Sequence, residues 1–599
     1  MRIPYLSNIR TSKPKDCFLE AWLPNLGRKR KSQFKISIGL ASMILGANAI
    51  NANSVLAQST VAPEAASETA EQIDSPVVLN VEETATLEDN AALDIPDRVI
   101  IESFQVVGSS VFTEAELASV LKEWTGRPLS LSELYQARSA ITSLYTGRGY
   151  VNSGAYIPPQ KLVSRRNVQS DISTVNTLEI AVLEGTLEGI NISGTDHLNQ
   201  RYIRSRIEKG AGTPLNVEDL LETLQMLRIN PLIKNVSAEL SAGISPGSSL
   251  LDVEIEEADP FKITTRFDNK RSPSVGSNRR GVGFVHSNLL GFGDKIAFDY
   301  TNTEGSDSID LSYAVPFNSL NGTLSFSYGT SDNEIIEDPF TPLDIQSESE
   351  YFELGLRQPL VSSPTEEFAM GLNFSFQESK TQLLDTPFPL SIGASEDGET
   401  RVSALRFFQE YINRSDVEVF ALRSSFNFGI DVFGATQNPD GIPDSAFFAW
   451  RGQSQWVRRL DEDFLFLLRG DVQLSSSELL PLEQFRLGGT DSVRGYRQDF
   501  ALGDNGLFAS AEMRIPLLRF RSINGVVQLT PFVDLGTIWN SDTDIDSDFL
   551  AAIGLGLNFS AGNGFNARLD WGIPLVDSEQ RGDSLQENGV YFTLNWNFL

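Results

Sequence analysis

The residues with the clearest potential for covalent chemistry are Gly582-Asp583-Ser584-Leu585, which match the motif that supplies a serine nucleophile in lipases. A serine hydrolase of that kind also needs a histidine base, here expected downstream of the serine. The only histidines are His197 and His286, and both come far before Ser584. We therefore expect this motif to form a turn in an outer loop, and we expect the chain not to be an enzyme.

Metal, nucleotide and nucleic-acid sites are not predicted either, and no cofactor is expected. Neither histidine has a metal partner at ligand spacing, and the only cysteine, Cys17, lies in a segment that we expect to be removed. The sequence has no Gly-x-x-x-x-Gly-Lys-Ser/Thr phosphate loop, so a bound nucleotide is not expected. A formal net charge of -31 would repel phosphate backbones, which argues against nucleic acid as a partner.

Residues 1–57 are predicted to be a signal peptide. Arg28-Lys29-Arg30-Lys31 supplies the positive region, Ile36 to Leu45 the apolar core, and Val55-Leu56-Ala57 a cleavage site. Ala47-Asn48-Ala49 is a second candidate cleavage site, and an N-terminal membrane anchor is the alternative. The apolar run is shorter than the ~20 residues that a spanning helix needs. If the mature chain enters a membrane, we expect it to do so as a closed barrel.

Residues 58–97 are rich in Ala, Thr, Glu and Asp and are expected to form a disordered acidic linker. Two blocks follow, at 98–185 and 186–258. The first has strand patterns at 100–107 and 177–184 and helical patterns at 113–122 and 131–146. The second has strand patterns at 187–192, 235–240 and 250–255 and helical patterns at 199–208 and 217–227. Ser130 and Glu133 have capping-box spacing. The repeated β-α-α-β-β order predicts two small α+β domains.

From residue 259 to residue 599 the hydrophobic pattern has period two. Phe374 and Phe376, for example, alternate with Ser375 and Gln377. About sixteen such segments occur, with mostly long connections after odd-numbered segments and short ones after even-numbered segments. Apolar outside and polar inside predicts a 16-stranded antiparallel outer-membrane β-barrel, with its turns and the two small domains on the periplasmic side. A soluble β-sandwich or β-solenoid is the alternative, and the aromatic clusters on the outward faces argue against it.

The loop between the eleventh and twelfth segments contains Val493-Arg494-Gly495-Tyr496. With two small domains, sixteen strands and this motif in the sixth outer loop, the chain resembles the Omp85 superfamily. In particular it is similar to the two-partner-secretion transporters of the FhaC/ShlB/HecB haemolysin secretion/activation type. The resemblance covers about residues 98–599 and implies that the small domains are POTRA domains. Pro214-Leu215-Asn216, Leu220 to Leu227 and Val253-Glu254-Ile255 resemble parts of the second one.

The resemblance also implies a partner for Arg494. In that family the loop folds back into the lumen, and its arginine meets an acidic residue within an aromatic-x-Asp-x-Gly motif. Here this motif is Phe532-Val533-Asp534-Leu535-Gly536, and the alternation independently puts Asp534 on the luminal face. A guanidinium and a carboxylate can form two parallel hydrogen bonds. Gly495 would allow a tight backbone and Tyr496 could pack on the inner wall; the alternative is a solvated loop arginine.

The function implied by the resemblance is the export of an unfolded partner protein, haemolysin-like or adhesin-like, through the barrel. The POTRA-like domains are expected to bind this partner by pairing it with their sheet edges. Outer-membrane lipids and the barrel-assembly machinery that inserts the barrel are the other expected partners. An Omp85-type insertase is the second candidate, although its relatives generally carry more than two POTRA domains. A passive diffusion channel is the third, and it would leave the small domains without a role.

Overall fold

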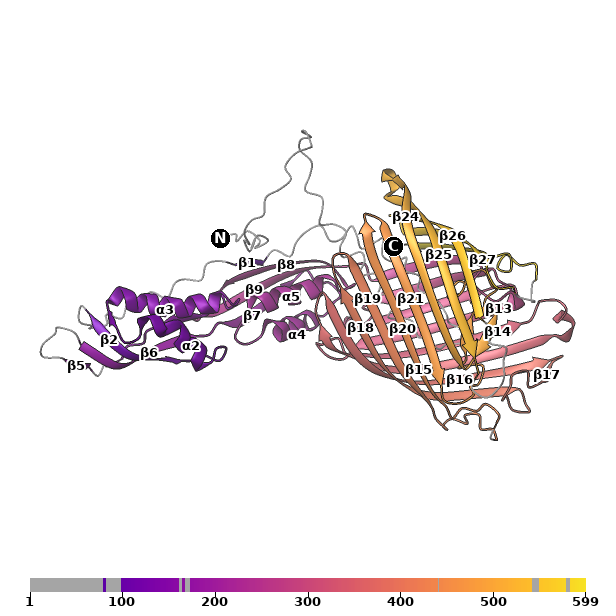
Figure 1. The fold of residues 1–599 in the computed structure, drawn as a ribbon, viewed down its shortest axis with the longest axis horizontal. Helices are drawn as coiled ribbons and strands as arrows, with labels where there is room; N and C mark the ends of the chain where they lie inside the picture. The colour runs from indigo at the N-terminus through magenta and orange to yellow at the C-terminus, as the bar shows by residue number, and fades with distance from the viewer. Residues whose placement is uncertain are drawn as a thin grey trace. The chain divides into compact units, whose positions relative to one another are not determined.

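The structure is a computed structural model that describes residues 79–81, 98–160, 164–166, 173–439, 441–540, 549–577 and 582–598. The predicted signal peptide at 1–57 and most of the predicted linker at 58–97 lie outside these residues. The chain divides into two compact units, and the division falls between Ala258 and Asp259 (Figure 1). Within the described residues, none of the helices has the length and apolar character that a membrane span requires.

The first small domain consists of one sheet and two α-helices, as the sequence predicts. Its elements are β2 (Val99–Val107), α2 (Glu114–Leu121), η3 (Lys122–Trp124), β3 (Pro128–Leu129), α3 (Leu131–Thr146), β4 (Gly154–Tyr156), β5 (Ser164–Arg166) and β6 (Ser173–Leu183). The strand order is β3-β2-β6-β4, and β5 also pairs with β6. The predicted capping box of α3 is confirmed, because Ser130 and Glu133 each accept a hydrogen bond from the other's backbone N–H. Leu134 and Ile141 of this helix are fully buried in the domain core.

The second small domain has the predicted β-α-α-β-β order. Its elements are β7 (Thr186–Ser193), α4 (Gln200–Ala211), α5 (Val217–Arg228), β8 (Ile233–Ala242) and β9 (Ser248–Glu257). β9 lies between β8, with which it is antiparallel, and β7, with which it is parallel. Leu220 and Leu224 of α5 are fully buried with Leu251 and Val253 of β9. Residues four positions apart on α5 and two positions apart on β9 therefore face the same core.

Glu184, the residue after β6, connects the end of that strand with Ser110 and with Tyr145 of α3. Its carboxylate accepts hydrogen bonds from the Ser110 backbone at 2.6 Å, the Ser110 hydroxyl at 2.5 Å and the Tyr145 hydroxyl at 2.8 Å. Burial raises the pKa of this carboxyl, but the hydrogen bonds from Ser110 and Tyr145 lower it further, so that the pKa lies below its ordinary value.

The expectation that the whole linker is disordered is wrong for one short stretch. Residues Leu79–Val81 form β1, which pairs in parallel with Ala238–Leu240 of β8. β8 would otherwise be an edge strand of the second domain's sheet, with unpaired backbone N–H and C=O groups. That free edge explains why a short segment without a hydrophobic period is held as a strand.

The second unit is a closed antiparallel barrel, and the predicted sixteen strands are confirmed. Its wall strands are β10 (Phe261–Asp268), β11 (Arg279–Ser287), β12 (Lys295–Asn302), β13 (Ser306–Pro316), β14 (Thr323–Glu334), β15 (Ile345–Ser362), β16 (Glu366–Leu383), β18 (Glu399–Arg414), β19 (Glu418–Gly429), β20 (Phe448–Asp461), β21 (Phe464–Ser475), β24 (Asn505–Phe520), β25 (Gly525–Trp539), β26 (Phe549–Ala561), β27 (Phe565–Pro574) and β28 (Val590–Phe598). The two-residue strand β17 (Thr386–Pro387) does not separate its neighbours, because β16 pairs directly with β18. The short helices η4 (Pro273–Val275), η5 (Thr341–Leu343) and η6 (Arg521–Ile523) lie in connections.

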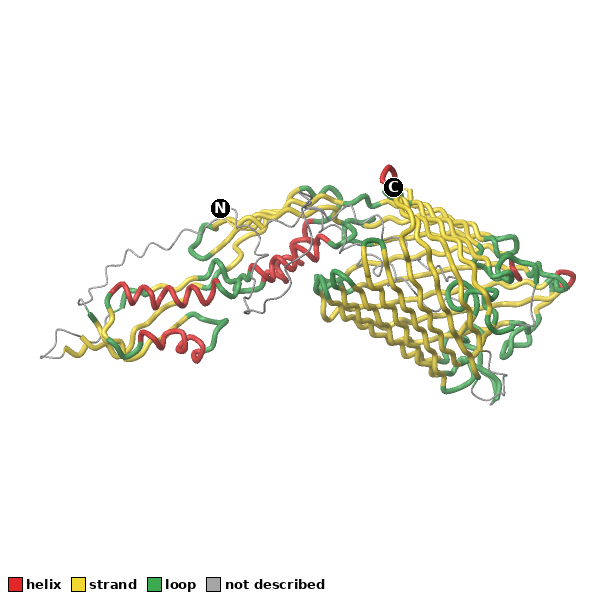
Figure 2. The backbone as a smooth tube through the Cα atoms, turned by 45° about the horizontal axis from the view of Figure 1, so that its top comes forward, coloured by secondary structure: helices red, strands yellow, loops and turns green. Residues whose placement is uncertain are grey.

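The barrel closes where β10 pairs with β28, from Ile263 opposite Phe598 to Asp268 opposite Thr593. Figure 2 shows the strands side by side around this closed wall. The two faces of the wall differ in polarity. On β25, Val533 is 45% exposed on the outer face, whereas Asp534 is fully buried on the inner face. This alternation gives the wall an apolar outer surface and a polar lumen, as the period-two pattern predicts.

Candidate functional site

Loop six, residues 476–504, connects β21 with β24 and carries the Val-Arg-Gly-Tyr motif. It contains a small hairpin of β22 (Phe485–Leu487) and β23 (Ala501–Gly503). Arg494 lies between these two strands, and its side chain is only 2% exposed. Because it contacts residues on the inner faces of the wall strands, the loop is folded into the lumen.

Arg494 forms a bidentate ion pair with Asp534 of β25. Its Nε donates to one carboxylate oxygen at 2.7 Å and an Nη donates to the other at 2.9 Å. The Arg494 backbone N–H adds a third hydrogen bond to Asp534 at 3.2 Å. The guanidinium also lies 3.4 Å from the centre of the Phe532 ring, which is a cation–π contact. Two members of the aromatic-x-Asp-x-Gly motif therefore hold the same guanidinium.

A wider charge network, which was not predicted from the sequence, surrounds this pair. Arg494 donates to Glu512 of β24 at 2.7 Å. Arg568 of β27 bridges Glu512, also at 2.7 Å, and Asp570 at 2.6 Å. Arg514 contacts Glu512 at 3.2 Å. Three guanidinium groups thus share three carboxylates, so their formal charges balance inside the lumen. Strand alternation could have placed each of these side chains on the luminal face, but not beside Arg494.

Gly495 and Tyr496 fix the backbone of the loop next to the motif arginine. Gly495 has φ of +104°, a conformation that favours glycine. Its N–H donates to the Tyr591 hydroxyl at 2.8 Å, and this hydroxyl donates to the Tyr496 carbonyl at 2.6 Å. The Tyr496 hydroxyl lies 3.0 Å from the carbonyl oxygens of both Ala551 and Val576. Tyr496 thus packs against the inner wall, where the sequence analysis expected it.

Val493 and Gly536 belong to an apolar cluster beneath the hairpin. Val493 is fully buried together with Leu487, Phe485 and Ile538. A Cβ at Gly536 would lie 2.4 Å from a methyl carbon of Leu487, so Leu487 would have to shift if a larger residue replaced this glycine. All seven residues predicted for the site therefore lie together: Val493, Arg494, Gly495, Tyr496, Phe532, Asp534 and Gly536.

A second buried ion pair anchors the start of loop six. Both Nη atoms of Arg406, on β18, donate to the carboxylate of Glu483, at 3.0 and 2.7 Å. The two side chains are only 4% and 5% exposed. Arg406 also donates to the Ser375 hydroxyl on β16 at 3.1 Å. Neither Arg406 nor Glu483 lies in a sequence motif that would have marked it.

Arg497, one residue after the motif, joins loop six to two other outer loops. It donates to both carboxylate oxygens of Glu337, in the β14–β15 loop, at 2.9 and 2.8 Å. It also donates to Glu587, in the β27–β28 loop, at 3.2 Å. Loop six is thus held at the outer rim as well as inside the lumen.

The lipase-like motif lies in the β27–β28 loop and is arranged as a turn. The Ser584 hydroxyl donates to the Glu587 carboxylate at 2.7 Å, and the Ser584 N–H donates to the same carboxylate at 3.0 Å. His197 is exposed and lies 3.8 Å from Glu257, far from Ser584 in the chain. The described residues include no group of three or more His, Cys, Asp or Glu side chains placed to hold a metal ion.

A family profile described as haemolysin secretion/activation protein ShlB/FhaC/HecB matches residues 247–559, which is more than half of the chain. The chain belongs to this family. A profile for the POTRA domain of the ShlB type matches residues 99–168, within the first small domain. The chain is therefore an outer-membrane transporter of two-partner secretion, and its POTRA domain of the ShlB type is periplasmic. The matching family consists of secretion proteins, so the insertase alternative gains no support from it.

Individual proteins that are similar to this chain are also named as transporters. Outer membrane transporter CdiB of Dickeya dadantii (strain 3937) is 22% identical over 450 residues, which are 73% of this chain and 75% of CdiB. Heme/hemopexin transporter protein HuxB of Haemophilus influenzae (strain 86-028NP) is 22% identical over 498 residues, 79% of this chain and 82% of HuxB. The solved structure of CdiB from Escherichia coli has the same fold, with a TM-score of 0.67 and 21% identity, over 95% of this chain and all of CdiB.

Proposed function

We propose that the Arg494–Asp534 ion pair holds loop six in the conformation that export of the secreted partner requires. The observation that carries this proposal is the buried bidentate contact, with oxygen–nitrogen distances of 2.7 and 2.9 Å. Charge-assisted hydrogen bonds of this geometry are about twice as strong as neutral ones. Removing either partner would upset the charge balance of the buried network, in a place with little water, and this is strongly destabilising.

The proposed cargo is an unfolded, haemolysin-like or adhesin-like protein. The two POTRA domains would bind it by β-augmentation, in which an extended segment adds to a sheet edge and pairs through its backbone. The sequence contains no nucleotide-binding phosphate loop, so we propose that folding of the cargo outside the cell makes the transfer directional. We also propose that the chain is not an enzyme, that lipids surround its barrel, and that the barrel-assembly machinery inserts it.

The experiment is secretion of the partner protein by cells that express Arg494→Ala or Asp534→Ala. Each variant should release much less partner into the medium while its barrel remains folded and inserted, as shown by heat-dependent gel mobility. Arg280→Ala is the matched control, because it removes an arginine from an exposed ion pair with Glu304 on the same barrel. Normal secretion by both lumen variants would overturn the proposal.

A further inference from the structure

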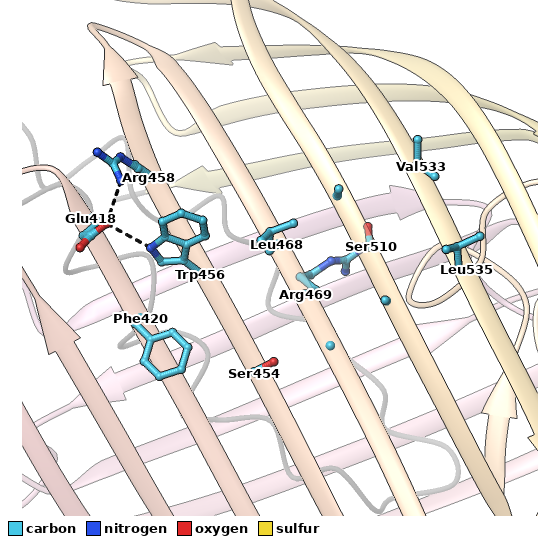
Figure 3. A pocket seen from close by; sticks show the side chains of 13 residues that line it. Glu418, Phe420, Ser454, Trp456, Arg458, Leu468, Arg469, Ser510, Val533 and Leu535 are labelled. Carbon is cyan, nitrogen blue, oxygen red and sulfur yellow. Dashed lines mark hydrogen bonds and ion pairs between the residues drawn. The ribbon is translucent and has the colours of Figure 1, made fainter.

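The outer, lipid-facing wall of the barrel carries a groove of about 800 Å³. Its volume falls within the range of about 300–1,000 Å³ that is usual for sites of small molecules. Figure 3 shows its lining, which consists of Glu418, Phe420, Ser454, Trp456, Arg458, Leu468, Arg469, Gly470, Ala509, Ser510, Ala511, Val533 and Leu535. These residues come from five neighbouring strands, β19, β20, β21, β24 and β25.

Strand register explains why the wall is hollowed here. Ser454 of β20 pairs with Gly470 of β21, and Gly470 pairs with Ala509 of β24. Small residues therefore lie side by side on three consecutive strands. Bulkier side chains border this floor, since Leu468 precedes Gly470 by two residues on β21 and Leu535 of β25 pairs with Ala509.

The groove faces hydrocarbon. Phe420, Leu468, Val533 and Leu535 line it and are all exposed on the outer face of the wall. Water is absent from the bilayer core, and an empty groove would leave these side chains without dispersion contacts on one side. The occupant of this part of the groove is therefore an apolar chain.

One end of the groove is polar. Glu418 is the first residue of β19, and Arg458 lies close to the end of β20, so both are at the rim of the short turns. This is the rim at which β10 begins after the periplasmic domains. The Trp456 indole N–H donates to Glu418 at 3.2 Å, and Arg458 lies 3.8 Å from the same carboxylate (Figure 3). Tryptophan at this level is typical of the interface between hydrocarbon and headgroups.

The two charged side chains at this end of the groove, Arg458 and Glu418, form only a long ion pair. At 3.8 Å, Arg458 and Glu418 attract but do not form a hydrogen bond, and their side chains are 50% and 40% exposed. Arg519, on the same rim, is paired much more closely, with Glu462 at 3.1 Å and Asp463 at 2.9 Å. Arg458 and Glu418 thus present a cation and an anion side by side that can each bind an opposite charge.

We propose that the groove binds one phospholipid of the periplasmic leaflet with a zwitterionic, amine-bearing headgroup. An acyl chain lies along Gly470, Ala509 and Ala511. The phosphate binds the Arg458 guanidinium, which suits planar, two-bond recognition of phosphate oxygens, and the ammonium binds the Glu418 carboxylate. The groove opens on the outer face of the wall, although one residue of its lining, Ser510, also accepts a hydrogen bond from Arg494 of loop six.

The test is native mass spectrometry of the full chain, released from detergent that contains phosphatidylethanolamine and phosphatidylglycerol with the same acyl chains. The wild-type chain should retain one phosphatidylethanolamine, with a preference of about fivefold over phosphatidylglycerol, which is the scale of an exposed charge contact. Ala511→Phe fills the floor and should abolish this retention. Ala567→Phe, at an outward position on β27 away from the groove, is the matched control and should retain the lipid.

The headgroup contact is tested separately by the double variant Glu418→Gln with Arg458→Gln, which should remove the preference for the amine lipid. Arg519→Gln is the control for the loss of a rim arginine and should keep the preference. Folding of every variant is checked by heat-dependent gel mobility, and Ala509→Leu replaces Ala511→Phe if the latter fails to fold. The proposal would be overturned if wild type retained no lipid or showed no headgroup preference. It would also be overturned if Ala511→Phe retained as much lipid as wild type, or if Ala567→Phe lost as much lipid as Ala511→Phe.

Discussion

Loop six is held at two levels by the same chemistry, an arginine between carboxylates, but water reaches the two levels differently. In the lumen, the side chains of Arg494 and Asp534 are 2% and 0% exposed. At the rim, those of Arg497 and Glu337 are 16% and 28% exposed. Exposed pairs contribute little because water and salt screen them, whereas breaking a buried pair leaves an unsolvated charge. On the proposal above, the lumen contact fixes the loop, and the partly exposed Arg497–Glu337 pair is the rim contact that opens at lower cost.

The largest effect should come from Asp534→Asn, which keeps the size of the side chain and removes the charge opposite Arg494. Loss of one member of a buried pair typically costs ~3–5 kcal/mol, so loop six should leave its position and secretion should fall by roughly tenfold or more. Conductance in planar bilayers should rise, because the loop no longer fills the lumen. Secretion and conductance at wild-type levels would show that the buried pair does not fix the loop.

A smaller effect is expected from Arg406→Met, which removes the buried anchor at the start of loop six. Glu483 loses two hydrogen bonds, but the Arg494 contact remains. Cleavage of loop six by added protease should therefore become faster than in wild type, while secretion falls less than with Asp534→Asn. If Arg406→Met abolished secretion as fully as Asp534→Asn, the distinction between the two anchors would be lost.

Arg497→Gln should have a still smaller effect on secretion, within about threefold, because the rim pair is partly exposed. Channel opening in planar bilayers should become more frequent. Raising the salt concentration from about 0.1 M to about 1 M should increase opening in wild type, since salt screens exposed charges. The same increase in salt should have little effect on channel opening in Arg497→Gln. An equal salt response in wild type and in this variant would show that the Arg497 contacts at the rim do not restrain opening.

The smallest effect is expected outside the barrel, at Glu184 of the first POTRA domain. Its carboxyl has a lowered pKa, so it stabilises the fold above the unfolded pKa of about 4.3. This stabilisation is lost as pH falls through the folded pKa. Calorimetry of the full chain should show the POTRA transition moving to lower temperature on acidification. Glu184→Gln should lower that transition at neutral pH and reduce its dependence on acid, and an unchanged dependence would contradict this.

The barrel could be predicted because a wall between lipid and water constrains every second residue. Alternation puts Asp534 on the inner face independently of the family resemblance, and the same rule applies to Glu512 and Arg568. Their meeting with Arg494 could not be predicted from spacing, because it depends on strand register, on closure of the barrel and on the path of a long loop. Only the family resemblance indicated that the loop folds inward.

The contacts that the sequence analysis missed have no local signature. Arg406 and Glu483 are far apart in the chain and follow no motif, and Arg497 binds residues of two other loops. The strand at Leu79–Val81 is three residues long and lies in a polar segment. It forms because β8 offers an unpaired edge, and a local hydrophobic pattern carries no information about that edge.

If the cargo pairs with the β8 edge as proposed, β1 is the segment that it must displace. Because both strands belong to one chain, β1 would compete for this edge intramolecularly with a strand of the cargo. β1 pairs with three of the ten residues of β8, from Ala238 to Leu240. An incoming strand that spans more of β8 forms more backbone hydrogen bonds than it displaces. On this proposal, the β8 edge would bind long extended segments more tightly than short ones, whatever their side chains.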